Sequence, residues 1–227
     1  SGYVDLSNPQ IKGDADLTNW LMALAPGRRG LDAGCGSGRY TIAYSRMDAG
    51  RMVGIDCGTE SLGAARRTTK AMDLRRVEFR EGDVLNLDFE DSTFDFVLSH
   101  GVLHHTNDME KGLREIHRVL KKGGHLWLQV YGDGLFWRIN DIFRALAKRT
   151  RSEMIRDRMA TIGYAPNKIF LYLDNSHVPI RNTYYWADVV KIVEGVGYNV
   201  VERIVRDVET EHFMYDNEQI YQGIPFA

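Results

Sequence analysis

The sequence has little cysteine and no excess of charge of either sign. Its 227 residues include two cysteines, Cys35 and Cys57, and neither a CxxC nor an HExxH pattern occurs. We therefore expect no disulfide framework, no metal site and a reducing, cytoplasmic environment. The chain carries 29 Lys and Arg against 31 Asp and Glu, and its pI is about 6.4. This balance lacks the basic footprint of nucleic-acid-binding proteins, which argues against a DNA or RNA partner.

Long apolar runs are also missing. No stretch approaches the roughly 18 residues that a membrane span needs, so we expect no membrane partner. The first residues lack the basic and then apolar pattern of a secretory signal. A hydrophobic fraction of 44% with 26% charged residues is ordinary for a globular protein. The length predicts one domain spanning residues 1–227.

What the chain does have is glycine at regular spacing. Residues 31–40 read LDAGCGSGRY, in which Gly34, Gly36 and Gly38 follow the acid Asp32. Glycine allows a tight turn or a close approach of backbone to a ligand. The turn follows a short apolar stretch, which predicts a position at the carboxyl end of a strand, where open α/β sheets bind ligands. The spacing differs from the dinucleotide pattern G-x-G-x-x-G, and a purely structural turn stays open as an alternative.

Short apolar runs alternate with amphipathic ones between residues 30 and 132. This alternation predicts a parallel sheet joined by right-handed crossovers and covered by helices on both faces. The expected strands share a short, buried composition and lie at 30–33, 51–56, 76–80, 94–99 and 124–131. The expected helices have apolar residues three and four apart or a composition rich in Ala and Arg, and lie at 40–46, 59–72 and 109–120.

Two regions depart from this alternation. Residues 1–27 come before the first strand and are expected to be helical over 15–24. Residues 133–182 form an insertion too long for a structureless connection, which predicts a helical cap. Within it we expect two helices, at 136–149 and 153–162, followed by loops marked by Pro166, Asp174–Asn175 and Val178–Pro179. The remaining expected elements close the chain: a helix at 186–194, a strand at 199–205 and a last strand at 211–215 or 219–221.

Acidic residues follow the expected second and third strands. Asp56 is suited to accept hydrogen bonds from the two hydroxyls of a ribose, and Asp83 from the exocyclic amine of a base. Asp32 is suited to hold an ammonium group or to fix the glycine turn. Each acid alone is equally explained as a turn or helix-capping residue. Together with the turn they favour a ligand that has an amino-acid end, a ribose and an adenine.

Five sequence motifs resemble those of the class I S-adenosylmethionine-dependent methyltransferases. In chain order they are LDAGCGSG, VGID, EGDV, FDFVLSHGVLHHT and REIHRVLKKGGHLWLQV. The resemblance covers about residues 28–131 and is closest to the methyltransferase-domain group with Leu-His-His after the fourth strand. It implies a Rossmann-like three-layer α/β sandwich with a seven-stranded, mostly parallel sheet ordered 3-2-1-4-5-7-6. It also implies S-adenosylmethionine as cofactor and S-adenosylhomocysteine as product.

The same resemblance implies roles for the residues at the strand ends. The first loop, in which Asp32, Gly34 and Gly36 contact the methionine moiety, also contains Ala33 and Cys35. We expect Cys35 to pack rather than react, because no basic residue neighbours it in sequence. The other implied contacts follow the cofactor from ribose to sulfonium: Asp56 at the ribose, Asp83 at the adenine amine, Cys57 and Val84 beside the adenine ring, and Ser99 and His100 near the sulfonium.

Three residues near the expected methyl group are candidate catalytic residues. His104 and His105 follow the fourth strand, and an imidazole suits deprotonation of a hydroxyl or an amine at neutral pH. Tyr131, which ends the fifth strand, is the third candidate. For the histidines, capping or packing beneath the next helix is the alternative. The aromatic residues of 136–186 are either core or substrate pocket, and His177 and Arg181 beside them could recognise an anionic or hydroxylated group.

We expect methyl transfer to an O or N atom of a small-molecule metabolite of the sugar or secondary-metabolite type. Methylation of a macromolecule is the second hypothesis. Against it, SHGV stands after the fourth strand where an N-P-P-Y type tetrapeptide would act on a planar amine, although an RNA or protein target stays open. A non-catalytic S-adenosylmethionine-binding protein is the third hypothesis. The glycine spacing disfavours an NAD-dependent oxidoreductase. The sequence leaves the acceptor and the oligomeric state undetermined.

Overall fold

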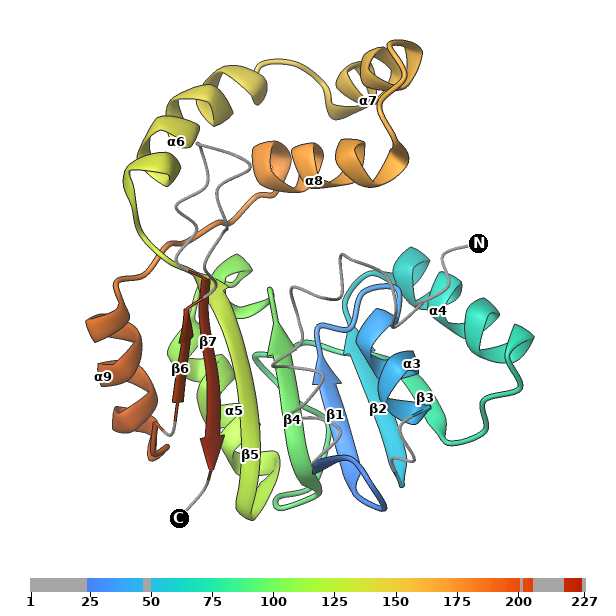
Figure 1. The fold of residues 1–227 in the computed structure, drawn as a ribbon, viewed down its shortest axis with the longest axis vertical. Coiled ribbons are helices and arrows are strands. Elements are labelled where there is room, and N and C mark those ends of the chain that lie inside the picture. The colour runs from blue at the N-terminus through green and yellow to red at the C-terminus, as the bar shows by residue number, and fades with distance from the viewer. Residues whose placement is uncertain (1–23, 47–49, 201, 206–218, 226–227) are drawn as a thin grey trace.

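The computed structural model describes residues 24–46, 50–200, 202–205 and 219–225 (Figure 1). Its centre is a sheet in which five parallel strands lie in the order β3-β2-β1-β4-β5. This confirms the expected Rossmann-like α/β architecture. The strands are β1 (Arg29–Ala33), β2 (Arg51–Asp56), β3 (Val77–Glu81), β4 (Phe94–His100) and β5 (Leu120–Tyr131).

Two further strands extend the sheet beyond β5. The strand β7 (Gln219–Pro225) pairs antiparallel with β5, and β6 (Glu202–Val205) pairs antiparallel with β7. The sheet therefore reads β3-β2-β1-β4-β5-β7-β6. The alternative last strand at 211–215 lies outside the described residues, as does all but the final residue of the helix expected at 15–24.

The composition of β4 explains why the sheet is covered on both faces. Phe94 and Val97 point into one hydrophobic cluster and Phe96 and Leu98 into another, and all four are fully buried. A strand that is buried on both faces needs a nearly continuous apolar run. The covering helices are α3 (Arg39–Ser45) and α4 (Thr59–Ala71) towards one side, and α5 (Met109–Val119) and α9 (Trp186–Val196) towards the other.

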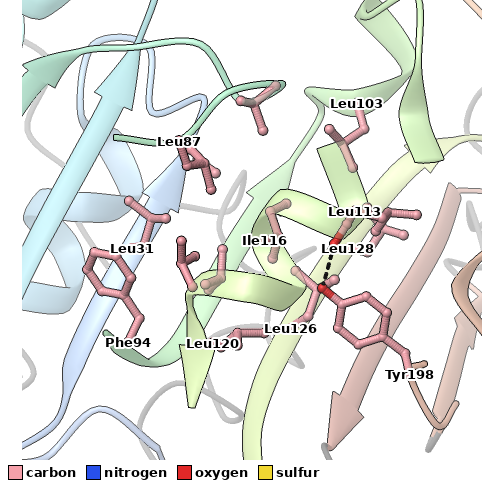
Figure 2. Packing of buried hydrophobic residues seen from close by; sticks show 14 of the residues in the cluster. Leu31, Leu87, Phe94, Leu103, Leu113, Ile116, Leu120, Leu126, Leu128 and Tyr198 are labelled. Carbon is pink, nitrogen blue, oxygen red and sulfur yellow. Dashed lines mark hydrogen bonds between the residues drawn. The ribbon is translucent and has the colours of Figure 1, made fainter. Parts of the chain in front are cut away.

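The larger cluster lies between the sheet and α5 (Figure 2). The α5 residues Leu113 and Ile116 are fully buried, three apart on one side of the helix. Tyr198, which follows α9, inserts its ring into this cluster and donates a hydrogen bond from its hydroxyl to the Leu113 carbonyl oxygen at 3.1 Å. Apolar packing with a satisfied hydroxyl therefore joins α5 to the segment after α9.

The insertion after β5 forms three helices, α6 (Leu135–Ala147), α7 (Ser152–Thr161) and α8 (Pro166–His177), which lie over the carboxyl ends of the parallel strands (Figure 1). The first two match the expected helices closely. The expected loop at Pro166 and Asp174–Asn175 is wrong, because α8 spans both. Pro166 begins this helix, where its fixed φ suits the first turn and its missing N–H costs no hydrogen bond. No helix in the described ranges is long and apolar enough to cross a membrane.

We predict that Leu113→Ala lowers the free energy of unfolding by about 2–5 kcal/mol, because it leaves a cavity in the main core. The matched control is Leu146→Ala in α6, where the side chain is 54% exposed and the change should stay within about 0.5 kcal/mol. Urea unfolding of both variants measures this difference. Equal losses from the two variants would contradict the packing described for α5.

Candidate active site

The glycine turn after β1 is held against the end of β2. The backbone N–H groups of Gly34 and Cys35 both donate to the Ile55 carbonyl, at 2.9 and 2.8 Å. Gly34 has a φ of 93°, and a Cβ there would lie 2.3 Å from a methyl group of Val102. Gly36 has a φ of 52°, but a Cβ there would meet no described atom within 4 Å. Close packing against Val102 thus explains why residue 34 is glycine. At Gly36 no described atom fills the space, so a ligand can approach the backbone there.

Asp32 ties the end of β1 to the helix that follows the turn. Its carboxylate is 2% exposed and accepts hydrogen bonds from the backbone N–H and the hydroxyl of Thr41, at 3.1 and 2.6 Å. Burial raises the pKa of Asp32 to about 7, although both bonds from Thr41 lower it. Of the two roles expected for Asp32, these contacts support fixing the turn. Thr41 was not predicted as a site residue.

Asp56 connects two loops at the end of β2. Its two carboxylate oxygens accept from the backbone N–H groups of Gly36 and Gly58, each at 2.8 Å. Each oxygen of an ionised carboxylate has a further lone pair, so both can also accept from a ligand hydroxyl. Asp56 also accepts at its backbone carbonyl from Gly82 N–H at 3.1 Å, which links the ends of β2 and β3.

The residues expected around an adenine ring differ in exposure. Asp83 is exposed, and one of its carboxylate oxygens accepts from Leu85 N–H at 2.9 Å. Cys57 is exposed, whereas Val84 is 8% exposed and packs in the main core. Since β1, β2 and β3 are neighbours in the sheet, Asp32, Asp56 and Asp83 follow one another along its carboxyl edge.

Cys35 is a buried packing residue, as expected. It is 8% exposed and lies in a cluster with Leu62 of α4 and Phe79 of β3. Burial raises the pKa of its thiol far above the usual range, with Asp32 and Asp56 adding to the effect. A thiol that keeps its proton is a poor nucleophile.

The end of β4 carries Ser99 and His100. Ser99 is fully buried, and its hydroxyl oxygen has no hydrogen-bond partner in the described part of the chain. The Nε2 atom of His100 lies 3.2 Å from the hydroxyl of Tyr40, with the two ring centroids 4.7 Å apart. Sequence reasoning did not single out Tyr40, although its place directly after the glycine turn was the available signal.

The three candidate catalytic residues form one aromatic group. The ring centroid of His104 lies 3.8 Å from that of Tyr131 and 4.1 Å from that of His105. His104 is fully buried, and neither ring nitrogen has a hydrogen-bond partner among the described residues. Burial, followed by the charges of His105, His100 and Arg181, holds the pKa of His104 well below its usual range. The imidazole is therefore neutral at neutral pH.

The segment that leaves the cap, residues 178–184, contacts this aromatic group. The Nδ1 atom of His105 lies 2.8 Å from the Ile180 carbonyl oxygen. Asn182 N–H donates to the His104 carbonyl at 2.8 Å, and Tyr184 N–H donates to the Tyr131 carbonyl at 3.0 Å. We call residues 178–184 the return segment. No sequence pattern predicted these contacts, because they join residues about 50 to 80 positions apart.

Of the two residues expected to recognise an acceptor, Arg181 lies in the return segment with its side chain 1% exposed, paired with Asp141 of α6. His177 is engaged within the cap, where its ring nitrogens lie 2.8 Å from the Ser176 hydroxyl and 3.0 Å from the Thr150 carbonyl. Phe136, Trp137 and Phe170 lie in helices whose side chains at these positions are outside the description.

Comparison with known proteins finds matches to the part of the chain that contains these strand ends. The family model for the methyltransferase domain matches residues 31–128. A demethylmenaquinone methyltransferase of Bacillus cereus is 35% identical over 106 residues, which are 46% of this chain and 45% of that protein. The chain thus matches less than half the length of this curated relative.

Two solved structures share the fold over nearly the whole chain. An S-adenosylmethionine-dependent methyltransferase from Aquifex aeolicus has a TM-score of 0.63 at 18% identity, covering 98% of this chain and 95% of its own. One from Mesorhizobium loti has a TM-score of 0.63 at 14% identity, covering 94% and 97%. At these identities the two structures show the likeness of fold alone.

The fold is the Rossmann-like methyltransferase fold, and the family match falls on its central part. Residues 31–128 match the methyltransferase domain, and this segment is related to demethylmenaquinone methyltransferase. The match to the methyltransferase domain implies S-adenosylmethionine as the methyl donor.

We predict that Asp32 makes stability fall as pH rises from about 4 to about 7. The unfolded carboxyl ionises near 3.8, whereas the buried one keeps its proton until about 7, so the folded state binds more protons in this window. The loss is of order 4 kcal/mol, since one pKa unit corresponds to about 1.4 kcal/mol. Asp32→Asn, which keeps an oxygen acceptor for Thr41, should remove the slope. Parallel stability curves for variant and wild type in urea unfolding across this range would refute the assignment.

Proposed function

We propose that the chain transfers a methyl group from S-adenosylmethionine to an O or N atom of a small-molecule metabolite, of the sugar or secondary-metabolite type. The observation that carries the proposal is the order of groups along the sheet edge: an open glycine turn, then Asp56, then Asp83. These groups match the amino-acid end, the ribose and the adenine of one ligand.

The contacts support the proposed cofactor roles. Gly34 and Gly36, with Ala33 and Cys35 shaping the same turn, present backbone to the methionine moiety, while Asp32 keeps the turn attached to α3. Asp56 uses its remaining lone pairs for the ribose hydroxyls. Three groups complete the proposed cofactor site: Asp83 at the adenine amine, Cys57 and Val84 at the ring, and Ser99 with His100 near the sulfonium. The buried hydroxyl of Ser99, which has no hydrogen-bond partner among the described residues, fits this position.

The bound cofactor supplies a methyl group already activated by the positive sulfonium. The chain must then align the acceptor atom with the methyl group, exclude water and take up a proton where the acceptor has one. The neutral imidazole of His104 has a nitrogen lone pair for this proton, and Tyr131 and His105 pack on its ring. Of the three candidates, His104 is the one we propose as the general base.

Two features support a small-molecule acceptor. Three helices of the cap lie over the carboxyl ends of the strands, and the return segment contacts the candidate catalytic residues. The relative from Bacillus cereus is named a demethylmenaquinone methyltransferase. We further propose that the described residues form one domain, with the cap at 133–182. Methylation of RNA or protein, or binding without turnover, are the competing functions.

Incubation of the protein with a metabolite pool and isotopically labelled S-adenosylmethionine tests the proposal. We expect label to appear in a small molecule, identified by mass spectrometry. Label found only in RNA or protein would favour the second function. Binding of S-adenosylhomocysteine without transfer to any of the three would favour the non-catalytic one.

We predict that His104→Phe lowers the turnover number by about 10²- to 10⁴-fold while cofactor affinity is largely kept, because the variant keeps a ring against Tyr131 but removes the base. His125→Asn, near the middle of β5 where His125 pairs with Phe96, is the matched control and should leave turnover unchanged. Wild-type activity should fall only at pH values well below the usual histidine pKa. Unchanged turnover in His104→Phe would assign His104 to packing.

A further inference from the structure

The helix α6 turns apolar side chains outward. Ile139, Ile142, Phe143 and Leu146 are 47%, 65%, 65% and 54% exposed. Their spacing of three and four puts them on one side of the helix. Such a stripe normally faces the core of a globular protein. We call these four residues the α6 stripe.

The inner side of α6 carries polar contacts that fix this orientation. Arg144 is 8% exposed and donates to the carbonyl oxygen of Val178 in the return segment. Asp141 pairs with the buried Arg181 of the same segment. A rotation of α6 that buried the stripe would break both interactions. The exposed stripe is therefore a stable feature of the cap.

Basic residues border the stripe. Lys148, Arg149 and Arg151 follow the end of α6, are exposed and have no ion pair within the described part of the chain. Arg138 is one turn ahead of Ile142 and pairs with Asp133 at 3.3 Å. Residues 138–158 contain seven Lys or Arg against three Asp or Glu, in a chain whose net charge is −2. Positive charge is thus concentrated where the apolar stripe is exposed.

We propose that the α6 stripe and its basic border dock on an anionic lipid surface. A helix with an exposed apolar side and flanking Lys and Arg lies in the interface plane of a bilayer, where the apolar side chains enter the headgroup region and the cations meet anionic lipids. The proposal is independent of methyl transfer, because it uses only the outer side of the cap. It concerns a peripheral contact and needs no membrane-spanning helix.

Charge also argues against a second copy of the chain as the occupant. A two-fold contact brings the same patch of both subunits together. A dimer through α6 would set Arg138, Lys148 and Arg149 of one chain against the same cations of the other. A bilayer rich in phosphatidylglycerol offers the opposite charge across the whole area.

Sedimentation of the full chain with vesicles tests the proposal. One set of vesicles is phosphatidylcholine and the other an equal mixture of phosphatidylcholine and phosphatidylglycerol. We expect binding to the mixed vesicles, weaker binding to the neutral ones and a decrease on addition of salt. Ile142→Ser with Phe143→Ser should weaken binding at least about tenfold, because the apolar contact is lost. Lys148→Glu with Arg149→Glu should weaken it at least about fivefold.

The controls separate docking from folding and from net charge. Ile142→Val with Phe143→Leu keeps the stripe apolar and should keep most of the binding. Arg67→Glu with Lys70→Glu makes the same charge change on exposed residues of α4 and should have little effect. Absence of wild-type binding, or equal losses from both charge variants, would overturn the proposal. A wild-type dimer that Ile142→Ser with Phe143→Ser converts to monomer would identify a second copy as the occupant and would also overturn it.

Discussion

The carboxylate of Asp56 accepts hydrogen bonds from the N–H groups of Gly36 and Gly58, so it holds the loop after β1 and the loop after β2 in one arrangement. The backbone of Asp56 adds a bond from Gly82 after β3. One residue therefore joins three neighbouring strand ends, in addition to the bonds from Gly34 and Cys35 to the Ile55 carbonyl. A ligand that contacts all three meets groups whose positions are already fixed, which reduces the ordering needed on binding.

A second set of contacts joins the cap to the candidate catalytic residues. The return segment bonds to the backbone of His104 and Tyr131, and it also carries the side chain that pairs with Asp141 of α6. A displacement of α6 would therefore move the return segment, and with it the backbone of the candidate catalytic residues His104 and Tyr131. The same contacts turn the apolar side of α6 outward. The polar contacts of the return segment therefore orient both sides of the cap: the side that faces the proposed methyl acceptor and the side proposed to dock on lipid.

Local patterns in the sequence predicted most of the sheet, whereas the cofactor residues that they indicated stay predictions. The strands were recognised because β4 and its neighbours are buried on both faces and read as apolar runs, and the glycine turn because its spacing is unusual. Residues that act across long separations were not predicted. Thr41, Tyr40 and Asn182 gain their roles only when the fold brings them to Asp32, His100 and His104. The helix α8 was mistaken for a loop because proline at a helix start and proline in a turn look alike in sequence.

Calorimetric titration with S-adenosylhomocysteine measures whether the sheet edge binds the cofactor through Asp56, as we propose. We expect saturable binding by the wild-type chain and binding about 10- to 100-fold weaker in Asp56→Asn, since hydrogen bonds to a charged acceptor contribute about 1.5–3 kcal/mol. Asp88→Asn, at an exposed acid of the following loop, should bind as the wild type does. Binding of NAD without binding of S-adenosylhomocysteine would show that the sheet edge takes a different cofactor. Equal affinity in Asp56→Asn and wild type would show that Asp56 does not hold it.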